Sequence, residues 1–423
     1  MPYQPRVLDD ELDLLVSGLP AVSIEGAKGV GKTATAQRKA ASAIRLDRPG
    51  DRRLAQADPE AALAGVKPLL LDEWQLAPAL WDVVRRAVDA DRAPGQFILT
   101  GSAMPPGDAR LHSGAGRIVR LRMRPMTLPE RGVSEPAVSL AALLAGGRDS
   151  IKGRCGLRIA DYAKEIVASG FPGIRSDPPR LRGRMIGSYI EQIVERDIPE
   201  TGADVRRPGE LLAWLTAYAA ATASTASYSV ILDSATPGQD AKPSRNTVSA
   251  YRALLDRIWI LDPLPAWTPA FNPLKRLAQA PKHHLADPAL AAQLLGSTAD
   301  SLLRATGPYE VRSEGGLLAA LFESLVALTV RVFAQPLQAR VFHLRTHRGE
   351  HEVDLLVERP DHCVLAIEVK LTAAPSPRSA KQLNWLESEI GETLIDKVVV
   401  TAGESAYRMP DGTAVVPLAL LGP

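Results

Sequence analysis

A phosphate-binding pattern lies near the start of the chain. Residues 26–33 read GAKGVGKT, a complete G-x-x-x-x-G-K-[ST] sequence between an apolar stretch and a helical one. Backbone N–H groups of such a loop turn inward around phosphates, and the following helix adds its dipole. Lys32 would reach the β- and γ-phosphates, and the Thr33 hydroxyl would bind Mg²⁺. The alternative is a glycine-rich turn without a ligand, but the flanking elements favour a nucleotide. The predicted ATP-binding residues of the loop are Gly26, Gly29, Gly31, Lys32 and Thr33.

Two acids follow a second apolar stretch. In LLLDEWQ, residues 69–75, Asp72 and Glu73 stand at the carboxyl end of a strand, where open α/β sheets bind ligands. Asp72 is suited to hold the Mg²⁺ that accompanies ATP, and Glu73 to orient and deprotonate the attacking water. A solvated strand exit would have the same composition, and the upstream loop favours the catalytic interpretation.

Further candidates for the nucleotide site follow. Thr100 and Ser102, in ILTGS, end the next strand and could contact the γ-phosphate, or could form a polar turn. Arg117, in GAGRIVR, is a candidate for the arginine that stabilises the transferring phosphate. A neighbouring subunit could supply that arginine instead. Competing arginines of the same stretch are Arg120, Arg122 and Arg124.

Charged residues also interrupt two apolar strands near the C-terminus. In HEVDLLVERPDHCVLAIEVK, residues 351–370, alternation predicts a hairpin in which Asp354, Glu368 and Lys370 break core-quality strands. With the loop at residues 359–363, Asp354 faces Glu368. Like charges about 5 Å apart destabilise a sheet, and a divalent cation between them would remove that cost.

This arrangement suggests metal-assisted hydrolysis. Asp354 followed by E-x-K on the next strand is the PD-(D/E)XK nuclease pattern, and Glu323, in GGLLAALFESLVALTVRVF, is the carboxylate that the first helix of that fold often provides. Mg²⁺ or Mn²⁺ would take these oxygen ligands and lower the pKa of bound water, and Lys370 would flank the scissile phosphate. Alternatives are salt bridges on an exposed sheet face, or a nuclease fold that binds without cutting.

Hydrophobic periodicity places these residues in an α/β chain. Expected strands at 21–26, 68–73, 96–103 and 116–123 form an N-terminal parallel sheet. The expected domains are 1–135, a P-loop ATPase domain; 150–275, a helical lid and winged-helix-like region; and 280–423, a PD-(D/E)XK-like α/β domain.

The middle region has the pattern of a winged helix. In KPSRNTVSAYRALLDRIWILDPLPAW, Ser244 would cap a recognition-type helix, and strands are expected at IWIL and near LPAW. Arg245 and Asn246 would contact bases or phosphates. The exposed face has few cations, so DNA binding and a protein-docking or structural role remain open alternatives.

Composition is that of an ordinary globular protein. The 423 residues are 46% hydrophobic and 23% charged, with a net charge of +2, which neither favours nor excludes nucleic acid. Cys155 and Cys363 match no metal or redox spacing. The uncharged stretch 211–232 fits a buried helix plus a loop better than a membrane span. We therefore expect a cytoplasmic protein without membrane partners.

GAKGVGKT, LLLDEWQ and ILTGS together resemble a group of prokaryotic AAA-type P-loop ATPases. Members pair an N-terminal ATPase with a C-terminal domain of unknown function that looks like the PD-(D/E)XK nuclease fold. The likeness continues in SGFPGI, YIEQIVERDI and HHLADPALAAQLLG, and it covers almost the whole chain. The resemblance implies architecture more firmly than biological role.

Two functions fit these observations. One is an ATPase coupled to a DNA- or RNA-binding or metal-dependent nuclease-like domain. The other is a non-cleaving, nucleotide-dependent switch, antitoxin-like or defence-related, that gates a protein partner or a homo-oligomer. A metabolic kinase fits less well, because the paired acids suit water activation and no small-molecule acceptor site is evident.

Overall fold

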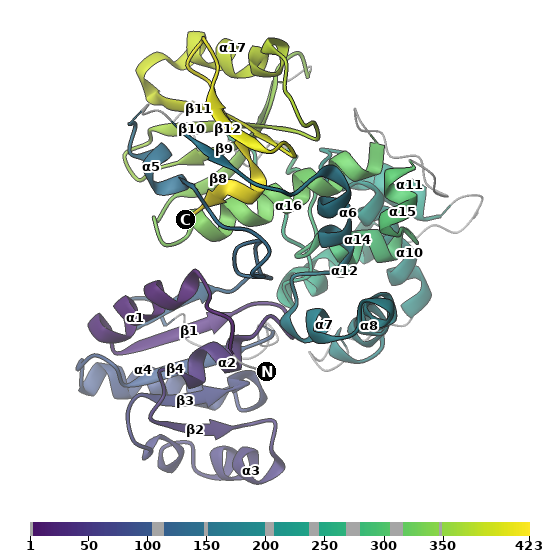
Figure 1. Cartoon of the computed structure of the whole chain (residues 1–423). Coiled ribbons are helices and arrows are strands. Elements are labelled where there is room, and N and C mark those ends of the chain that lie inside the picture. The colour runs from purple at the N-terminus through teal and green to yellow at the C-terminus, as the bar shows by residue number, and fades with distance from the viewer. Residues whose placement is uncertain are drawn as a thin grey trace.

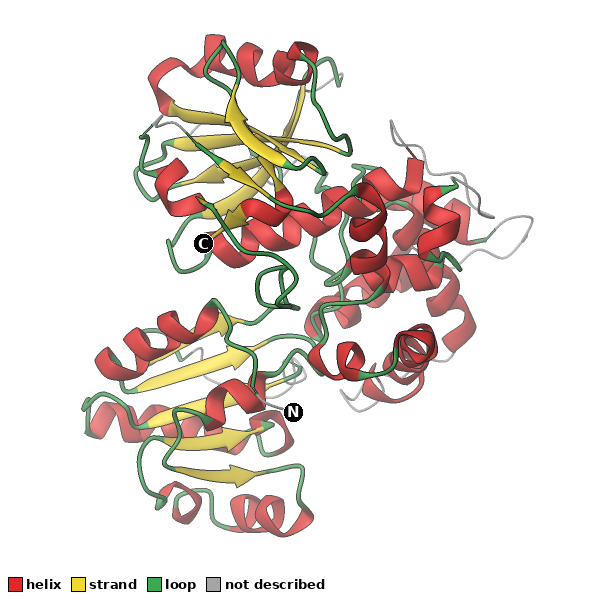
Figure 2. Ribbon diagram, in the orientation of Figure 1, coloured by secondary structure: helices red, strands yellow, loops and turns green. Residues whose placement is uncertain are grey.

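The chain folds into three modules in the computed structural model, an α/β module at the N-terminus, a helical middle and a second α/β module (Figure 1). Strands occupy the first and third modules, and helices dominate the middle (Figure 2). The structure describes residues 3–103, 114–147, 151–198, 207–236, 245–267, 280–304, 316–346 and 349–423.

The N-terminal module is a parallel sheet with the spatial order β2-β3-β4-β1-β5. β1, β3 and β4 are buried along their whole length, as continuous apolar runs in a parallel sheet are. The predicted N-terminal parallel sheet is therefore confirmed. β2 was not predicted, because none of its residues is buried and its sequence lacks an apolar run. The strands are β1 Ala21–Glu25, β2 Ser42–Arg45, β3 Leu69–Asp72, β4 Phe97–Gly101 and β5 Ile118–Arg122, and the helices are α1 Leu8–Gly18, α2 Lys32–Gln37, α3 Pro49–Ala57 and α4 Ala79–Ala90.

The middle module is a group of short helices. Helix α8 ends in a π-helical turn. The helices of the middle module are α6 Ile159–Val167, α7 Pro172–Ser176, α8 Pro179–Gln192, the π-helical turn Ile193–Asp197, α10 Pro208–Ala220, α11 Tyr228–Ala235, α12 Arg245–Arg257, α14 Pro288–Leu294 and α15 Ala299–Leu303.

The segments that we expected to form a wing pair with other parts of the chain. Ser244 and the side chain of Arg245 lie outside the described part of the structure. After α12 the chain forms isolated bridges, Leu261 with Leu285 and Leu264 with Lys282, in place of a strand hairpin of its own. Residues 281–303, which we expected to open the last domain, contribute α14 and α15, which pack against α6 of the middle.

The C-terminal module is a mixed sheet with the order β7-β12-β13-β11-β10-β9-β8. β7 comes from a segment far upstream, and so does α5, which packs on β10 and β11 (Figure 1). The strands are β6 Val138–Ser139, β7 Gly153–Arg154, β8 Arg340–Arg345, β9 Glu352–Glu358, β10 Val364–Lys370, β11 Leu394–Thr401, β12 Ser405–Arg408, β13 Ala414–Pro417 and β14 Leu421–Gly422, and the helices are α5 Leu140–Leu144, α16 Gly316–Ala334 and α17 Lys381–Ile390.

Helix α16 joins the second and third modules. It packs against β8, β9 and β10 on one side and against α6 and α14 on another. Among the described helices it alone has the length and apolarity to cross a membrane, but 72% of its apolar window is buried inside the protein. Its hydrophobic composition is thus accounted for by its central position.

Candidate functional sites

The P-loop joins the carboxyl end of β1 to the start of α2. Gly29 and Gly31 have φ of +83° and +106°, which other residues rarely adopt, so the loop depends on glycine there. The Lys32 ammonium is buried and donates to the carbonyl oxygens of Gly26 and Ala27 at 2.8 and 2.9 Å. Burial lowers the pKa of Lys32 to about 8, although Glu73 and Asp72 oppose the shift. Lys32 is therefore positioned in the loop, bonded to its backbone.

The two acids meet the P-loop at the same edge of the sheet. The Thr33 hydroxyl donates to Asp72 Oδ1 at 2.7 Å, and Thr100 donates to the same oxygen from β4. β4 lies between β1 and β3, which is why its end brings Thr100 beside Asp72. A hydroxyl and a carboxylate in contact are hard oxygen donors of the kind that Mg²⁺ prefers, so these residues fit that ion.

Glu73 lies in a strained turn directly after β3. Its φ of +56° is in the left-handed region, uncommon for a residue other than glycine and typical of functional sites. Its Oε2 accepts from the Ser102 hydroxyl at 2.9 Å and from the Gln75 amide. The carboxylate predicted to act on water is therefore held in place by the next strand, and Gln75 is a contact that the sequence did not predict.

Arg117 lies away from this edge. It precedes β5, whose Ile118 pairs with Ala21 at the start of β1, whereas the P-loop follows Glu25 at the other end of that strand. Its guanidinium Nε donates to Asp89 of α4 at 2.7 Å. Within one chain Arg117 is thus separated from the P-loop by the length of a strand. The competing arginines form ion pairs with Glu25 (Arg120) and with Asp262 (Arg122 and Arg124).

A cavity of about 640 Å³ lies beside the P-loop. Its walls come from the N-terminal segment at Tyr3, from α2 at Thr35, and from the middle module at Pro172 and Arg175. Such a cavity, part apolar and part polar, adjoins the place where the phosphates of a nucleotide would lie. Gly31 of the predicted P-loop also lines the cavity. Tyr3, Thr35, Pro172 and Arg175 were not predicted as site residues, because their separation along the chain carries no local signal.

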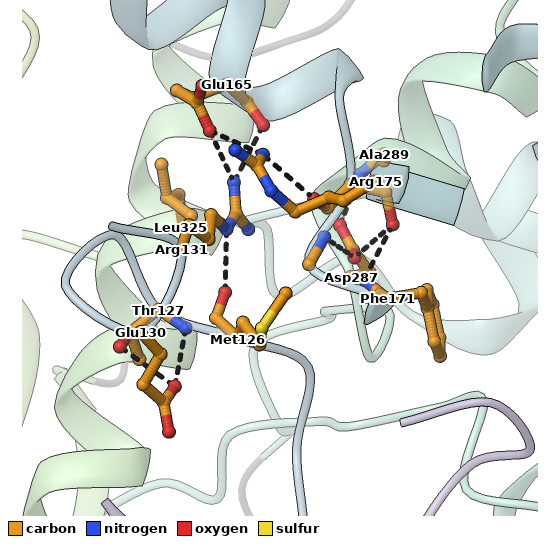
Figure 3. A network of polar contacts seen from close by, with 12 residues as sticks. Met126, Thr127, Glu130, Arg131, Glu165, Phe171, Arg175, Asp287, Ala289 and Leu325 are labelled. Atoms are coloured by element: carbon orange, nitrogen blue, oxygen red, sulfur yellow. Dashed lines mark hydrogen bonds and ion pairs between the residues drawn. The ribbon is translucent and has the colours of Figure 1, made fainter. Parts of the chain in front are cut away.

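Polar contacts in the cavity wall connect the first two modules (Figure 3). Arg131 donates to the Met126 carbonyl at 2.8 Å and to the Glu165 carbonyl at 2.8 Å. Glu165 Oε2 also accepts from Arg175 at 2.7 Å. Nearby, Asp287 accepts from the Gly170 backbone N–H at 2.6 Å. The stretches SGFPGI and HHLADPALAAQLLG therefore meet here, in a structural contact close to the P-loop.

The P-loop also contacts the middle module directly. Lys28 Nζ lies 2.8 Å from Asp197 Oδ1, and the Tyr189 hydroxyl donates to the Lys28 carbonyl at 2.9 Å. Tyr189 in turn packs on Phe171, with ring centroids 5.0 Å apart. A change in the loop on nucleotide binding would therefore reach the middle module through contacts that already exist.

The C-terminal hairpin has the register that the sequence predicted. Glu358 pairs with Val364 and Leu355 with Ile367, so the next step brings Asp354 beside Glu368. Asp354 Oδ2 accepts from the Val369 backbone N–H at 2.9 Å, and Lys370 lies 2.8 Å from Glu368 Oε1. The pattern residues therefore come together as expected.

A cation that the sequence did not predict occupies their centre. Lys282 Nζ lies 2.8 Å from Glu323, 2.9 Å from Glu352 and 3.0 Å from Asp354, and its side chain is 1% exposed. Burial alone would lower the pKa of Lys282, but the carboxylates outweigh it and raise that pKa well above its usual value. Among the described residues, no three or more His, Cys, Asp or Glu side chains are arranged so that they could hold a metal ion.

Glu368 remains incompletely partnered beside this cluster. Its Oε2 is buried without a hydrogen bond among the described residues. Burial first and then the Asp354 charge raise the pKa of its carboxyl group. An orphaned carboxylate oxygen among other carboxylates fits a divalent cation. The carboxylates Glu323, Glu352, Asp354 and Glu368 border a cavity of about 800 Å³, which is also lined by the cations Arg345, Lys370, Arg378 and Lys381.

Known sequences resemble this chain in each module. Residues 19–131 match the family described as AAA domain, residues 159–301 match a domain of unknown function (DUF8612), and residues 318–421 match another (DUF4143). The uncharacterized proteins Mb2031c of Mycobacterium bovis and Rv2008c of Mycobacterium tuberculosis are each 27% identical over 411 residues, 94% of this chain and 80% of theirs.

Among solved structures, the Walker-type ATPase PABY2304 of Pyrococcus abyssi aligns with 68% of this chain and 94% of its own, at 15% identity and a TM-score of 0.38. That likeness is too low to support further argument. The AAA domain match, taken with the P-loop and its paired acids, identifies residues 19–131 as a P-loop ATPase domain.

Proposed function

We propose that this chain binds Mg-ATP at residues 26–33 and hydrolyses it with Glu73 as the base. The observation that carries the proposal is the convergence of Thr33, Asp72 and Glu73 at one sheet edge, with Glu73 fixed by Ser102. Lys32 exchanges its carbonyl partners for phosphate oxygens when ATP enters. Glu73 orients the attacking water and accepts its proton, and Ser102 keeps the carboxylate in position.

The remaining parts of the nucleotide have places nearby. Asp72 and Thr33 would hold Mg²⁺, which when bound offsets charge on the phosphate oxygens. The cavity of about 640 Å³ beside α2 accepts the base and sugar. Arg117 would act on the nucleotide of a neighbouring copy, since within its own chain it pairs with Asp89.

ATP hydrolysis by purified full-length protein tests this proposal. Lys32→Ala should abolish tight ATP binding. Glu73→Gln should keep ATP binding and lower the hydrolysis rate by about 10²- to 10⁴-fold, the usual contribution of a general base. Glu60→Gln, a change at an exposed acid of the same module, serves as the matched control and should leave the rate unchanged. Full hydrolysis by Glu73→Gln would refute the assignment of the base.

For the C-terminal module we propose metal-dependent cleavage of a nucleic acid. The lining of the 800 Å³ cavity by both acids and cations supports this function. A metal ion held by the acids would activate water, and the cations would bind the charged phosphodiester. Asp354, Glu368 and Glu323 would hold the Mg²⁺ or Mn²⁺, which when bound lowers the pKa of water. Lys370 would flank the phosphate. The alternative is a non-cleaving switch that gates a protein partner.

Strand breakage distinguishes these functions. Supercoiled DNA, single-stranded DNA and RNA would be incubated with the protein and Mg²⁺ or Mn²⁺, with and without ATP. Cleavage that disappears in Asp354→Ala, while ATP hydrolysis persists, supports the nuclease. Intact nucleic acid under every condition, with ATP still hydrolysed, refutes it and supports the switch.

A further inference from the structure

The cation in the C-terminal acid cluster comes from outside the sheet that supplies the acids. Lys282 belongs to two short paired segments, 261–264 and 282–285, which we call the Lys282 ribbon. The ribbon is held by hydrogen bonds between Lys282 and Leu264, at 2.8 Å in one direction and 2.9 Å in the other. Glu323 comes from α16, whereas Glu352 and Asp354 come from β9. The ammonium is thus inserted into the cluster by a separate segment.

The contacts of Lys282 are those of a cation in an oxygen site. An ammonium has three N–H donors and no acceptor. Carboxylate oxygens of Glu323, Glu352 and Asp354 lie at 2.8, 2.9 and 3.0 Å, and those of Glu323 and Asp354 accept hydrogen bonds from the ammonium. Glu368 Oε2, buried at the edge of the cluster, has no hydrogen-bond partner in the part of the chain that the structure describes. Three carboxylates therefore surround one ammonium, and the fourth, which pairs with Lys370 through Oε1, has an oxygen left over.

The Lys282 ribbon is also attached to the ATPase module. Asp262, on the ribbon, lies 2.8 Å from Arg124 and 3.0 Å from Arg122 of the segment that ends the first sheet. Arg122 pairs in register with Glu25, the residue that precedes the P-loop. The segment that inserts Lys282 therefore contacts the strand next to the nucleotide site.

We propose that Glu323, Glu352, Asp354 and Glu368 form a divalent-cation site for which Lys282 is a built-in competitor, so that metal binds only when the ammonium is withdrawn. This inference rests on the metal site proposed for the C-terminal module, and adds Glu352 as a ligand and Lys282 as the group that blocks it. Two cations among the same carboxylates repel each other strongly in a buried site, so they exclude one another. Movement of the Lys282 ribbon away from the cluster opens the site.

Lys282→Met in the full-length chain removes the charge at similar side-chain volume. Mn²⁺ binding would be measured without nucleotide, by electron paramagnetic resonance of free Mn²⁺, for wild type, Lys282→Met and Lys282→Met/Asp354→Asn. We expect Lys282→Met to gain a Mn²⁺ site at least tenfold tighter than any in wild type, and the double variant to lose it. A folded Lys282→Met protein that binds Mn²⁺ no better than wild type overturns the proposal.

The same comparison separates the metal site from the competition. Tight Mn²⁺ binding already in wild type that is lost in the single variant Asp354→Asn would keep the site and overturn the role of Lys282. Binding in neither protein would overturn both. Neither result bears on ATP hydrolysis, which is measured independently.

Thermal unfolding provides a second readout with a matched control. Lys282→Met leaves the carboxylates facing one another, so its melting temperature should fall, and Mn²⁺ should restore it. Lys397, a buried lysine of β11 that lies 2.6 Å from Glu387, is the control. Lys397→Met should melt lower without recovery in Mn²⁺. Equal recovery of both variants, or of neither, contradicts the proposal. If Lys282→Met does not fold, Lys282→Gln, which keeps donors and loses the charge, replaces it in both measurements.

Discussion

Asp262 is predicted to be essential for stability, because this buried carboxylate lies between three guanidiniums. Its Oδ1 lies 2.8 Å from Arg331 of α16 and 3.0 Å from Arg122, and Oδ2 lies 2.8 Å from Arg124. The Asp262 side chain is 5% exposed. It therefore connects the ATPase module with the central helix of the protein. The substitution Asp262→Asn removes the negative charge and keeps the shape.

The expected loss of stability follows from the buried guanidiniums, which lose their counter-charge in Asp262→Asn. Breaking a buried ion pair costs about 3–5 kcal/mol, because the remaining charge is left without its counter-charge. Arg331 also donates to the backbone carbonyl of Asp262 at 2.8 Å, a bond that Asn preserves. We therefore expect the free energy of unfolding to fall by about 3 kcal/mol, the lower end of that range. This loss corresponds to roughly a hundredfold in the folded-to-unfolded ratio.

The pH dependence has a definite sign. Burial alone would raise the pKa of the Asp262 carboxyl group, but the guanidiniums, Arg122 first, outweigh burial and hold that pKa well below its usual range. A depressed carboxyl pKa stabilises the folded state above the unfolded-state pKa of about 3.9, and the contribution is lost as the pH falls below it. The difference between wild type and Asp262→Asn should be constant from about pH 5 to 8 and shrink below about pH 4.

Urea unfolding of the full-length chain measures this difference. Asp89→Asn is the control, because Asp89 pairs with Arg85 and Arg117 at the exposed surface and should contribute nothing measurable. A loss below about 1 kcal/mol in Asp262→Asn, or an equal loss in Asp89→Asn, would refute the argument that burial makes this carboxylate indispensable.

Other predictions concern the nucleotide site and the core. The pKa of Lys32 is lowered to about 8, so ATP affinity should be constant below pH 8. Above pH 8 the ammonium deprotonates, and the affinity should fall by up to about tenfold per pH unit. Titration of a fluorescent ATP analogue from pH 7 to 9.5 checks this, and a flat profile would contradict it. Phe322 is 0% exposed and packs on Tyr162 with ring centroids 5.3 Å apart. Phe322→Ala should therefore destabilise the protein by about 3–5 kcal/mol in the same urea assay, and a loss near zero would show that the site collapses around the cavity.

Local pattern was sufficient for several features of this protein. GAKGVGKT and LLLDEWQ predicted the loop and the acids, since residue order around a strand end determines which side chains reach that edge. The register of the C-terminal hairpin also followed from the sequence, because strand alternation and loop length together define it. These predictions depend on residues that are close along the chain.

Contacts between distant segments were decided by the tertiary structure alone. Residues 138–154 add β6, α5 and β7 to the C-terminal module, although they follow the ATPase module in sequence. Arg117 is at the opposite end of its strand from the P-loop. Lys282, next to two histidines in PKHHLADP, has no spacing that relates it to Glu323 or Asp354. Only folding brings this lysine to the carboxylates. Buried carboxylates require a counter-charge, and the packing of the modules determines which segment supplies it.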